Sequence, residues 1–166
     1  MNKPYLIAEI GVNFYDTAKS LNIEPIEAAK LYIDKAAEAG VDCAKFQSYK
    51  ANTIVSKNSP AYWDTTKEPT KTQYELFLKH DSFGEKEYRE LCDYTHEKGL
   101  DFTSTPFDYA SVDYLEDMVD FYKISTAESY GVFGICVGII LVTSLVLYFL
   151  NDKFMWLFGK IVNKEK

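Results

Sequence analysis

The sequence predicts an α/β protein: the first half of a parallel (βα)8 barrel with about four βα units, followed by one C-terminal transmembrane helix. Two observations support this fold class. Between residues 5 and 125, short apolar runs alternate with helical patterns, which is the order that builds a parallel sheet. Residues 129–151 then carry no charged side chain at all.

The first unit is predicted to be a strand, a helix and a second strand. Residues 5–10 form a short apolar run, which we expect to be a buried strand. Residues 24–39 place apolar side chains at helical spacing between Pro25, which suits a first turn, and Gly40, which suits a C-terminal cap. Residues 41–47 form the next strand. This order favours parallel pairing through a right-handed crossover.

The stretch 48–81 is rich in tyrosine and threonine and lacks sustained periodicity, apart from a helical turn around 73–78. A connection of this length in a compact domain is usually either functional or disordered, and the sequence leaves both alternatives open.

The following elements repeat the strand and helix order. We expect a helix at 85–98, a strand at 100–104, a helix at 111–118 and a fourth strand at 121–125. The buried face of the first of these helices is predicted to consist of Tyr88, Leu91, Cys92 and Thr95.

Composition excludes several classes of protein. At 166 residues, the chain is short of the roughly 250 residues of a complete barrel. A net charge of −7 argues against nucleic acid as a partner, because phosphate binding needs a basic surface. Three widely spaced cysteines indicate neither a disulfide framework nor a zinc site. The N-terminus does not resemble a signal peptide, so we expect the body to be made in a reducing cytosol.

Polar residues gather where the predicted strands end, which is where ligands bind in such folds. They are Glu9, Asn13, Lys45, Gln47, Thr103, Ser104, Thr105, Lys123, Ser125, Thr126 and Glu128. Lys45 and Lys123 lie in strands that are otherwise apolar, where a lysine is costly unless it meets an anion. The pattern predicts a site for a phosphorylated or carboxylated small molecule. The alternative, that each lysine only pairs with a neighbouring carboxylate such as Glu9, stays open.

Six motifs follow one another along the chain: AEIGVN at 8–13, AGVDCAKFQSYKA at 39–51, NSPAYWD at 58–64, QYELF at 73–77, FTSTPFD at 102–108 and YKIS at 122–125. In these motifs the sequence resembles the N-terminal half of the sialic acid synthases, a family that also makes related nonulosonic acids. The resemblance divides the chain into a partial barrel at 1–128, the apolar run at 129–151 and a short basic tail at 152–166.

The resemblance implies condensation of phosphoenolpyruvate with an N-acylated amino sugar such as N-acetylmannosamine, assisted by a divalent metal (Mn or Mg) that polarises the sugar aldehyde. It implies that Lys45, Thr105, Lys123 and Thr126 face phosphoenolpyruvate. Glu9, Gln47 and Glu128 would face the sugar or transfer protons, with Lys45 counted among the catalytic residues. Asn13 would contribute to substrate binding.

The sequence departs from this family in ways that bear on activity. Phe14 follows Asn13 where a histidine is common, although the NFYD of residues 13–16 matches a subgroup of the family. The metal-binding histidines of the family lie on later strands. His80 and His96 are not expected to replace them, and we expect His96 to be a solvated surface residue. We therefore predict no metal ligands in this chain and little or no catalysis by it alone. The alternatives are a membrane-anchored, non-catalytic binding or assembly module, pairing with itself or a complementary half-barrel, or a frameshift or fusion product.

The run 129–151 would span roughly 34 Å as a helix, which is enough to cross a bilayer core. Buried strands run only about 4–8 residues between turns, so length favours a single-pass membrane helix in contact with lipid. The lysines of the tail favour a cytoplasmic tail, whereas a phosphoenolpyruvate site needs a cytoplasmic body. We expect the body to lie in the cytoplasm.

Overall fold

The computed structural model divides into two compact units, residues 1–124 and 125–166. It describes residues 3–124 of the first unit and residues 139 and 142 of the second. The predicted membrane helix at 129–151 and the basic tail at 152–166 therefore fall outside the described residues, apart from those two positions. Within the described ranges, no helix combines the length and apolarity needed to cross a bilayer.

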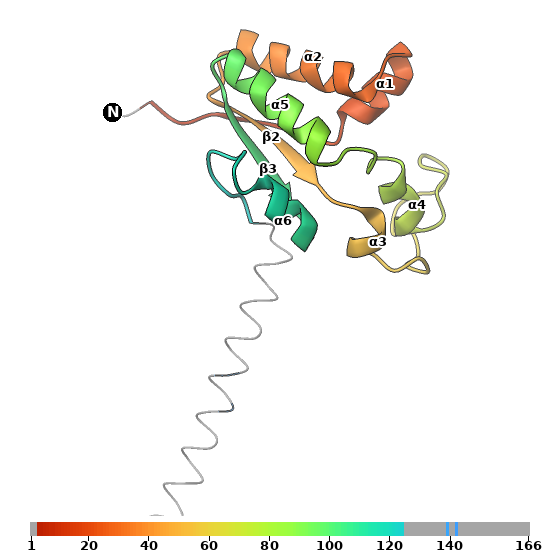
Figure 1. Ribbon diagram of the computed structural model, residues 1–166. Helices are drawn as coiled ribbons and strands as arrows, with labels where there is room; N and C mark the ends of the chain where they lie inside the picture. Colours follow the sequence, from red (N-terminus) through yellow and green to blue (C-terminus); the bar gives the residue numbers. More distant parts are fainter. Residues whose placement is uncertain (1–2, 125–138, 140–141, 143–166) are drawn as a thin grey trace, which may run out of the picture. The chain divides into compact units, whose positions relative to one another are not determined.

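The first unit contains a parallel sheet of three strands. These are β1 (Ile7–Gly11), β2 (Cys43–Ser48) and β3 (Asp101–Pro106), which lie side by side in chain order. Figure 1 shows β2 and β3 beneath the long helices. The prediction of a parallel α/β sheet is confirmed for these three strands.

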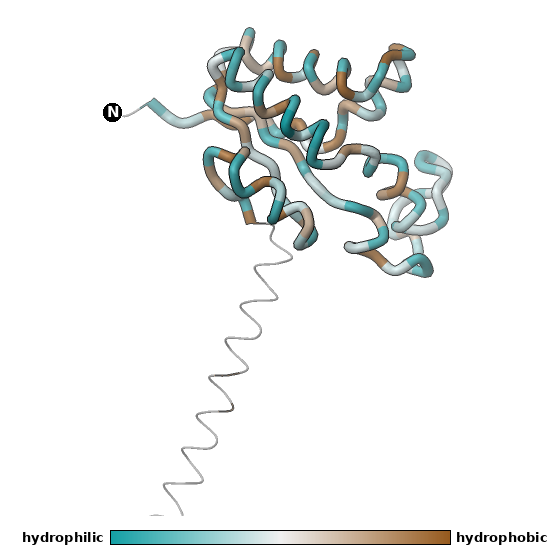
Figure 2. Tube along the Cα trace, viewed as in Figure 1, coloured by the Kyte–Doolittle hydropathy of each residue, from teal (hydrophilic) through white to brown (hydrophobic). Residues whose placement is uncertain are grey.

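Two long helices cover one face of this sheet. Helix α2 (Pro25–Glu38) contacts β2, and helix α5 (Glu85–Glu97) contacts β3 and lies beside α2 (Figure 1). Hydrophobic and hydrophilic residues alternate along both helices in Figure 2, as expected where one side packs against a sheet. The predicted buried face of α5 is confirmed, because all four of its residues are buried.

The core between the sheet and the helices is built around aromatic side chains. The rings of Phe46 on β2 and Phe102 on β3 lie 5.8 Å apart, and both side chains are fully buried. Phe14 stacks on Phe83 at 4.9 Å and meets Phe46 edge-on. Phe14 begins helix α1 (Phe14–Leu21), which the sequence analysis did not predict. The residue that replaces the family's common histidine therefore serves packing.

The long stretch after β2 is folded rather than featureless. It contains helix α3 (Ala51–Ile54) and helix α4 (Gln73–Leu78), and Pro60 pairs with Thr72 in an antiparallel bridge. Thr72 caps α4, since its hydroxyl accepts a hydrogen bond from the Glu75 N–H while the Glu75 carboxylate accepts one from the Thr72 N–H. The helical turn predicted at 73–78 is confirmed.

Strand β1 is less buried than predicted. Tyr5, Leu6 and Ile7 are 50%, 46% and 46% exposed. Tyr5 and Leu6 precede β1, which lies at one edge of the sheet with β2 as its neighbour among the described strands. An apolar run alone does not distinguish an edge strand from a central one.

The fourth strand predicted at 121–125 is wrong for residues 121–124, which form no strand. The chain after helix α6 (Tyr109–Leu115) does return to β3, because the Asp120 N–H donates to the Phe102 carbonyl at 2.9 Å. The next contact comes from a side chain, the Thr103 hydroxyl, which donates to the Phe121 carbonyl at 2.6 Å. No regular pairing with β3 follows in residues 121–124.

Candidate active site at the carboxyl ends of the strands

A charged pair occupies the middle of the sheet. Strand register places Glu9 beside Lys45, and Lys45 beside Thr103. The Lys45 ammonium donates to the Glu9 carboxylate. The Lys45 side chain is 3% exposed and that of Glu9 is 64% exposed. The pairing that the sequence left open is therefore present, but it joins a buried cation to a carboxylate that still faces solvent.

The next row toward the carboxyl ends contains a polar group without a partner. Gln47 pairs in register with Thr105, which is fully buried. Among the described residues, the Thr105 hydroxyl oxygen has no hydrogen-bond partner. A buried hydroxyl left unsatisfied costs about 1–3 kcal/mol, so such a group needs a reason to persist. A ligand atom at this end of the sheet would supply the missing bond.

Gly11 ends β1 next to the Gln47 side chain. Its φ of +60° lies in the left-handed region, which other residues rarely adopt. A Cβ atom at this position would also come within 3.6 Å of the Gln47 amide oxygen. That distance is an ordinary van der Waals contact, so the positive φ, rather than a clash with Gln47, is what favours glycine here.

The structure does not bring the remaining predicted site residues together with Lys45 and Thr105. Asn13 is exposed just after β1, and its side chain makes no capping hydrogen bond to α1. Lys123 is exposed and lies outside any strand, so the expectation that it is buried in a fourth strand is wrong. Ser125, Thr126 and Glu128 lie outside the described residues.

A pocket of about 310 Å3 opens next to Gln47. It is lined by Gln47, Tyr49, Ile54, Val55, Gln73, Phe77 and Phe107. Sequence reasoning missed this pocket, although Gln73 and Phe77 belong to the QYELF motif and Phe107 belongs to FTSTPFD. The long stretch after β2 supplies most of the wall, which fits the functional alternative for this stretch.

Asp108 fastens the pocket wall to the end of β3. One carboxylate oxygen accepts hydrogen bonds from the Lys50 N–H at 3.0 Å and the Thr53 hydroxyl at 2.6 Å, and the other caps α6 through the Ser111 N–H at 2.7 Å. Burial works against the charged form, yet the hydrogen bonds from Ser111 and Thr53 outweigh it and lower the pKa of Asp108 below its usual value.

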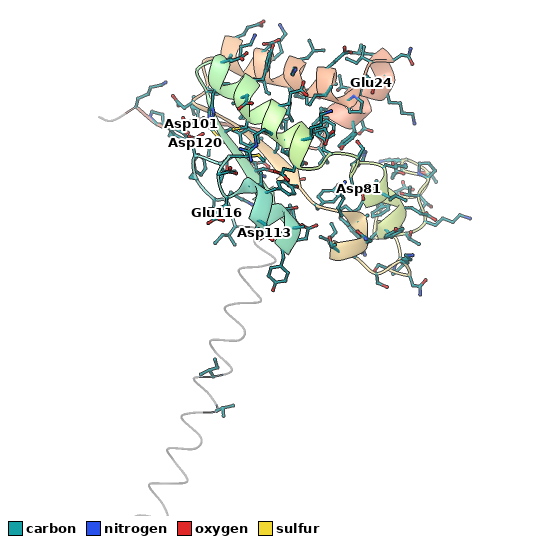
Figure 3. The ribbon with its side chains drawn as sticks, viewed as in Figure 1. Glu24, Asp81, Asp101, Asp113, Glu116 and Asp120 are labelled. Carbon is teal, nitrogen blue, oxygen red and sulfur yellow. The ribbon has the colours of Figure 1, made fainter. Side chains whose placement is uncertain are left out.

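The Lys50 side chain makes a second connection within this region. Its ammonium donates to the carbonyl oxygens of Asp81 and Phe83 at 2.5 and 2.8 Å, and the Asp81 carboxylate accepts from the Ala51 N–H at 2.9 Å. Figure 3 shows Asp81 near α3 and α4, apart from Asp101 and Asp120. Lys50 is thus a structural lysine.

The described residues do not fit the expected divalent metal. His80 faces the Asp16 carboxylate at 3.6 Å and His96 faces Asp120 at 2.9 Å. Throughout residues 3–124, no three histidine, cysteine or acidic side chains converge as metal ligands do. His96 is exposed, as expected of a surface residue. Burial raises the pKa of Asp120, but hydrogen bonds to His96 and to the Phe102 N–H outweigh it and lower that pKa.

Comparison with known proteins shows the family to which the chain belongs. The model of the NeuB family matches residues 32–132. The chain belongs to the NeuB family. It is 34% identical over 127 residues to the N,N'-diacetyllegionaminic acid synthase of Legionella pneumophila, covering 75% of this chain and 33% of that protein. It is 30% identical over 126 residues to the human N-acetylneuraminate-9-phosphate synthase, with the same coverage.

A solved structure gives the same result. The N-acetylneuraminic acid synthetase of Leptospira borgpetersenii matches with a TM-score of 0.61 and 26% identity, covering 80% of this chain and 39% of that one. The resemblance to the N-terminal half of the sialic acid synthases is therefore confirmed at the level of family and fold. The chain spans about a third of the length of the curated NeuB relatives that it matches.

Proposed function

We propose that this chain provides the phosphoenolpyruvate-binding part of a sialic acid synthase site. The observation that supports this most directly is the pair of buried polar groups on adjacent rows of the sheet, the Lys45 ammonium and the partnerless Thr105 hydroxyl. A cation and a hydroxyl donor suit the phosphate and carboxylate of phosphoenolpyruvate. Lys123, Thr126 and Asn13 remain proposed members of this site.

The proposed reaction joins the enol carbon of phosphoenolpyruvate to the aldehyde carbon of an N-acylated amino sugar. Water adds to the cation that forms at the next carbon, and inorganic phosphate leaves. Lys45 would hold the negative charge of phosphoenolpyruvate in place. Glu9, which is exposed and beside Lys45, would accept or deliver a proton. Gln47 would face the sugar, and Glu128 would be a further proton carrier.

We assign no step of this reaction to a metal ion, because the described residues include no suitable set of metal ligands. We accordingly propose that the 166-residue chain alone binds substrate but does not turn it over. The alternative remains a binding or assembly module that acts with another copy or a complementary half-barrel. Purification with a fragment that supplies the other barrel strands would favour this alternative.

The proposal is tested by measuring the binding of phosphoenolpyruvate to the full chain with 31P nuclear magnetic resonance. Loss of one charge-assisted hydrogen bond is worth roughly 1.5–3 kcal/mol, so Lys45→Met should weaken binding at least about tenfold. Lys86→Met, which removes an exposed lysine of α5, is the matched control and should bind normally. Absence of saturable binding by the unaltered chain, or equal binding by both variants, would refute the proposal.

We also propose that residues 129–151 anchor the chain in a membrane as a single pass, with the body in the cytoplasm. The support is the length of the charge-free run. Alkaline phosphatase fused to the C-terminus should be active if the tail lies outside, as this orientation requires. An inactive fusion would indicate the opposite orientation, with the tail in the cytoplasm. Release of the full chain from membranes by alkaline carbonate would show that residues 129–151 do not anchor it.

A further inference from the structure

The backbone carbonyl of Gln47 faces the side of β2 on which β1 lies. Along β2, the Cys43 N–H donates to the Leu6 carbonyl, just before β1, at 3.1 Å. The Ser48 carbonyl accepts from the Phe107 N–H, just after β3, at 3.0 Å. Successive residues of a strand direct their backbone groups to opposite neighbours, so residues 43, 45 and 47 face β1 and residue 48 faces β3.

Strand β1 ends before it reaches the Gln47 carbonyl. Its register with β2 stops at Gly11, which lies opposite Phe46. The Tyr88 hydroxyl takes the place of a further β1 residue and donates to the Gln47 carbonyl at 2.6 Å. Figure 1 shows α5, which carries Tyr88, beginning near the carboxyl end of β2. A helix side chain thus completes the hydrogen bonding of the last predicted site residue on β2.

Packing fixes the Tyr88 side chain in this position. Tyr88 is buried, its ring lies nearly parallel to that of Tyr114 at 5.9 Å, and it meets Phe83 edge-on at 5.9 Å. Burial raises the pKa of Tyr88 well above its ordinary value, so the hydroxyl keeps its proton and stays a donor. On the other side of β2, the Ser48 and Ser104 hydroxyls share a hydrogen bond of 2.7 Å. The end of β2 is therefore held from both sides.

We propose that Tyr88 is a positioning residue for phosphoenolpyruvate binding, because its hydroxyl fixes the end of β2 that carries Lys45 and Gln47. Gln47 pairs in register with Thr105, whose hydroxyl has no partner among the described residues. Without the Tyr88 hydroxyl, the Gln47 carbonyl loses its donor, so its peptide must turn or admit water. Either change displaces this row of the sheet relative to Lys45. The inference rests on the proposed function, since it names a residue that orders the same site.

Tyr88→Phe tests the inference, because it keeps the packed ring and removes only the hydroxyl. In the full chain in mild detergent, it should raise the dissociation constant of phosphoenolpyruvate about tenfold, since small displacements of binding groups are costly. The number of sites per chain should stay at its unaltered value. A role in stability alone would instead lower the number of sites through unfolding and leave the affinity of the folded chains unchanged. Titration followed by 31P nuclear magnetic resonance gives both quantities.

Tyr94→Phe is the matched control. Tyr94 lies on the same helix, and its hydroxyl donates to the Asp34 carboxylate of α2 at 2.9 Å. This variant also loses one tyrosine hydroxyl and its hydrogen bond, but that bond joins two helices and does not reach β2. It should therefore bind phosphoenolpyruvate with the affinity of the unaltered chain.

A second measurement uses the unaltered chain, so it does not depend on the folding of a variant. Glutamine occurs only at positions 47 and 73, so labelling glutamine with 13C at the backbone carbonyl gives one signal for each position. Saturating phosphoenolpyruvate should shift the Gln47 signal. Tyr88→Phe should shift the same signal in the absence of phosphoenolpyruvate, whereas Tyr94→Phe should not.

The outcomes distinguish the inference from the proposed function. Equal affinity of the unaltered chain and Tyr88→Phe, or equal loss of affinity in Tyr88→Phe and Tyr94→Phe, would overturn the positioning role and leave the proposed function intact. A Gln47 carbonyl signal that does not respond to saturating phosphoenolpyruvate would have the same consequence. An unaltered chain that does not bind phosphoenolpyruvate would refute both.

Discussion

Thr103 and Thr105 show how neighbouring residues of one type differ in their chemical situation. Both lie on β3, both are fully buried, and their side chains point to the same face, two positions apart. The Thr103 hydroxyl donates to the Phe121 carbonyl, whereas that of Thr105 has no partner among the described residues. The first hydroxyl stabilises the fold, and the second is the one that we propose to bind phosphoenolpyruvate.

This difference predicts opposite effects of the same substitution. Thr105→Val should leave the free energy of unfolding unchanged or raise it by about 1 kcal/mol, because it removes an unsatisfied buried hydroxyl. Thr103→Val should lower it by about 1–3 kcal/mol, because the Phe121 carbonyl loses its donor. Urea unfolding followed by circular dichroism measures both values. Similar losses for the two variants would show that the Thr105 hydroxyl is satisfied in the folded chain.

Removing Glu9 and removing Lys45 should also have unequal effects on the free energy of unfolding. Glu9→Gln leaves the buried ammonium without its counter-charge and should lower the free energy of unfolding by about 1–2 kcal/mol, a value reduced by the exposure of Glu9. Lys45→Met leaves only a carboxylate that water already reaches and should cost less, although it weakens phosphoenolpyruvate binding. Unfolding midpoints in urea compare the two variants, and a greater loss for Lys45→Met would contradict this account.

At the scale of elements, hydrophobic periodicity in the sequence predicted the long helices, whose formation depends mainly on contacts close in sequence. The helices near 24–39 and 85–98 bury one face each, so their periodicity is visible in the sequence and their bounds agree with α2 and α5. Helix α1 was missed, although Phe14, Ala18 and Leu21 have helical spacing, because it is short and follows a strand directly. The residues at 121–124 read as a strand, but strand formation depends on neighbours that a local pattern does not reveal.

Asp108 joins three elements, so its protonation should matter to stability. Its pKa in the folded chain lies below the usual 3.8. The stabilisation is therefore complete above about pH 4 and is lost as the pH falls through the lower, folded value. We expect Asp108→Asn to lower the free energy of unfolding by about 1–2 kcal/mol at pH 7, because an amide cannot accept on both atoms.

The pH dependence of stability tests whether the charge of Asp108 causes this effect. The difference in stability between Asp108→Asn and the unaltered chain should shrink as the pH falls below about 4, because the carboxyl of the unfolded chain takes up its proton there while the folded carboxyl stays charged to a lower pH. Urea midpoints at pH 7, 5, 4 and 3 measure it. A difference that stays constant down to pH 3 would mean that the lowered pKa of Asp108 does not contribute to stability.

For the whole molecule, the decisive question is which parts of a synthase site the chain contains. Residues 3–124 hold a buried cation, a partnerless hydroxyl and an uncharged pocket at one end of a parallel sheet. They hold no cluster of metal ligands. Under the proposed function, we expect substrate binding by these residues to be separate from any metal-dependent chemistry.

This separation predicts two results with the full chain. Phosphoenolpyruvate should bind with the same affinity in EDTA as in Mn2+, because Lys45 and Thr105 meet its charges without a metal. With phosphoenolpyruvate, N-acetylmannosamine and Mn2+ all present, release of inorganic phosphate should not exceed that of the Lys45→Met variant. Phosphate release that depends on Lys45 and stops in EDTA would show that residues beyond 3–124 complete a metal site, and the prediction that this chain lacks turnover would then be wrong.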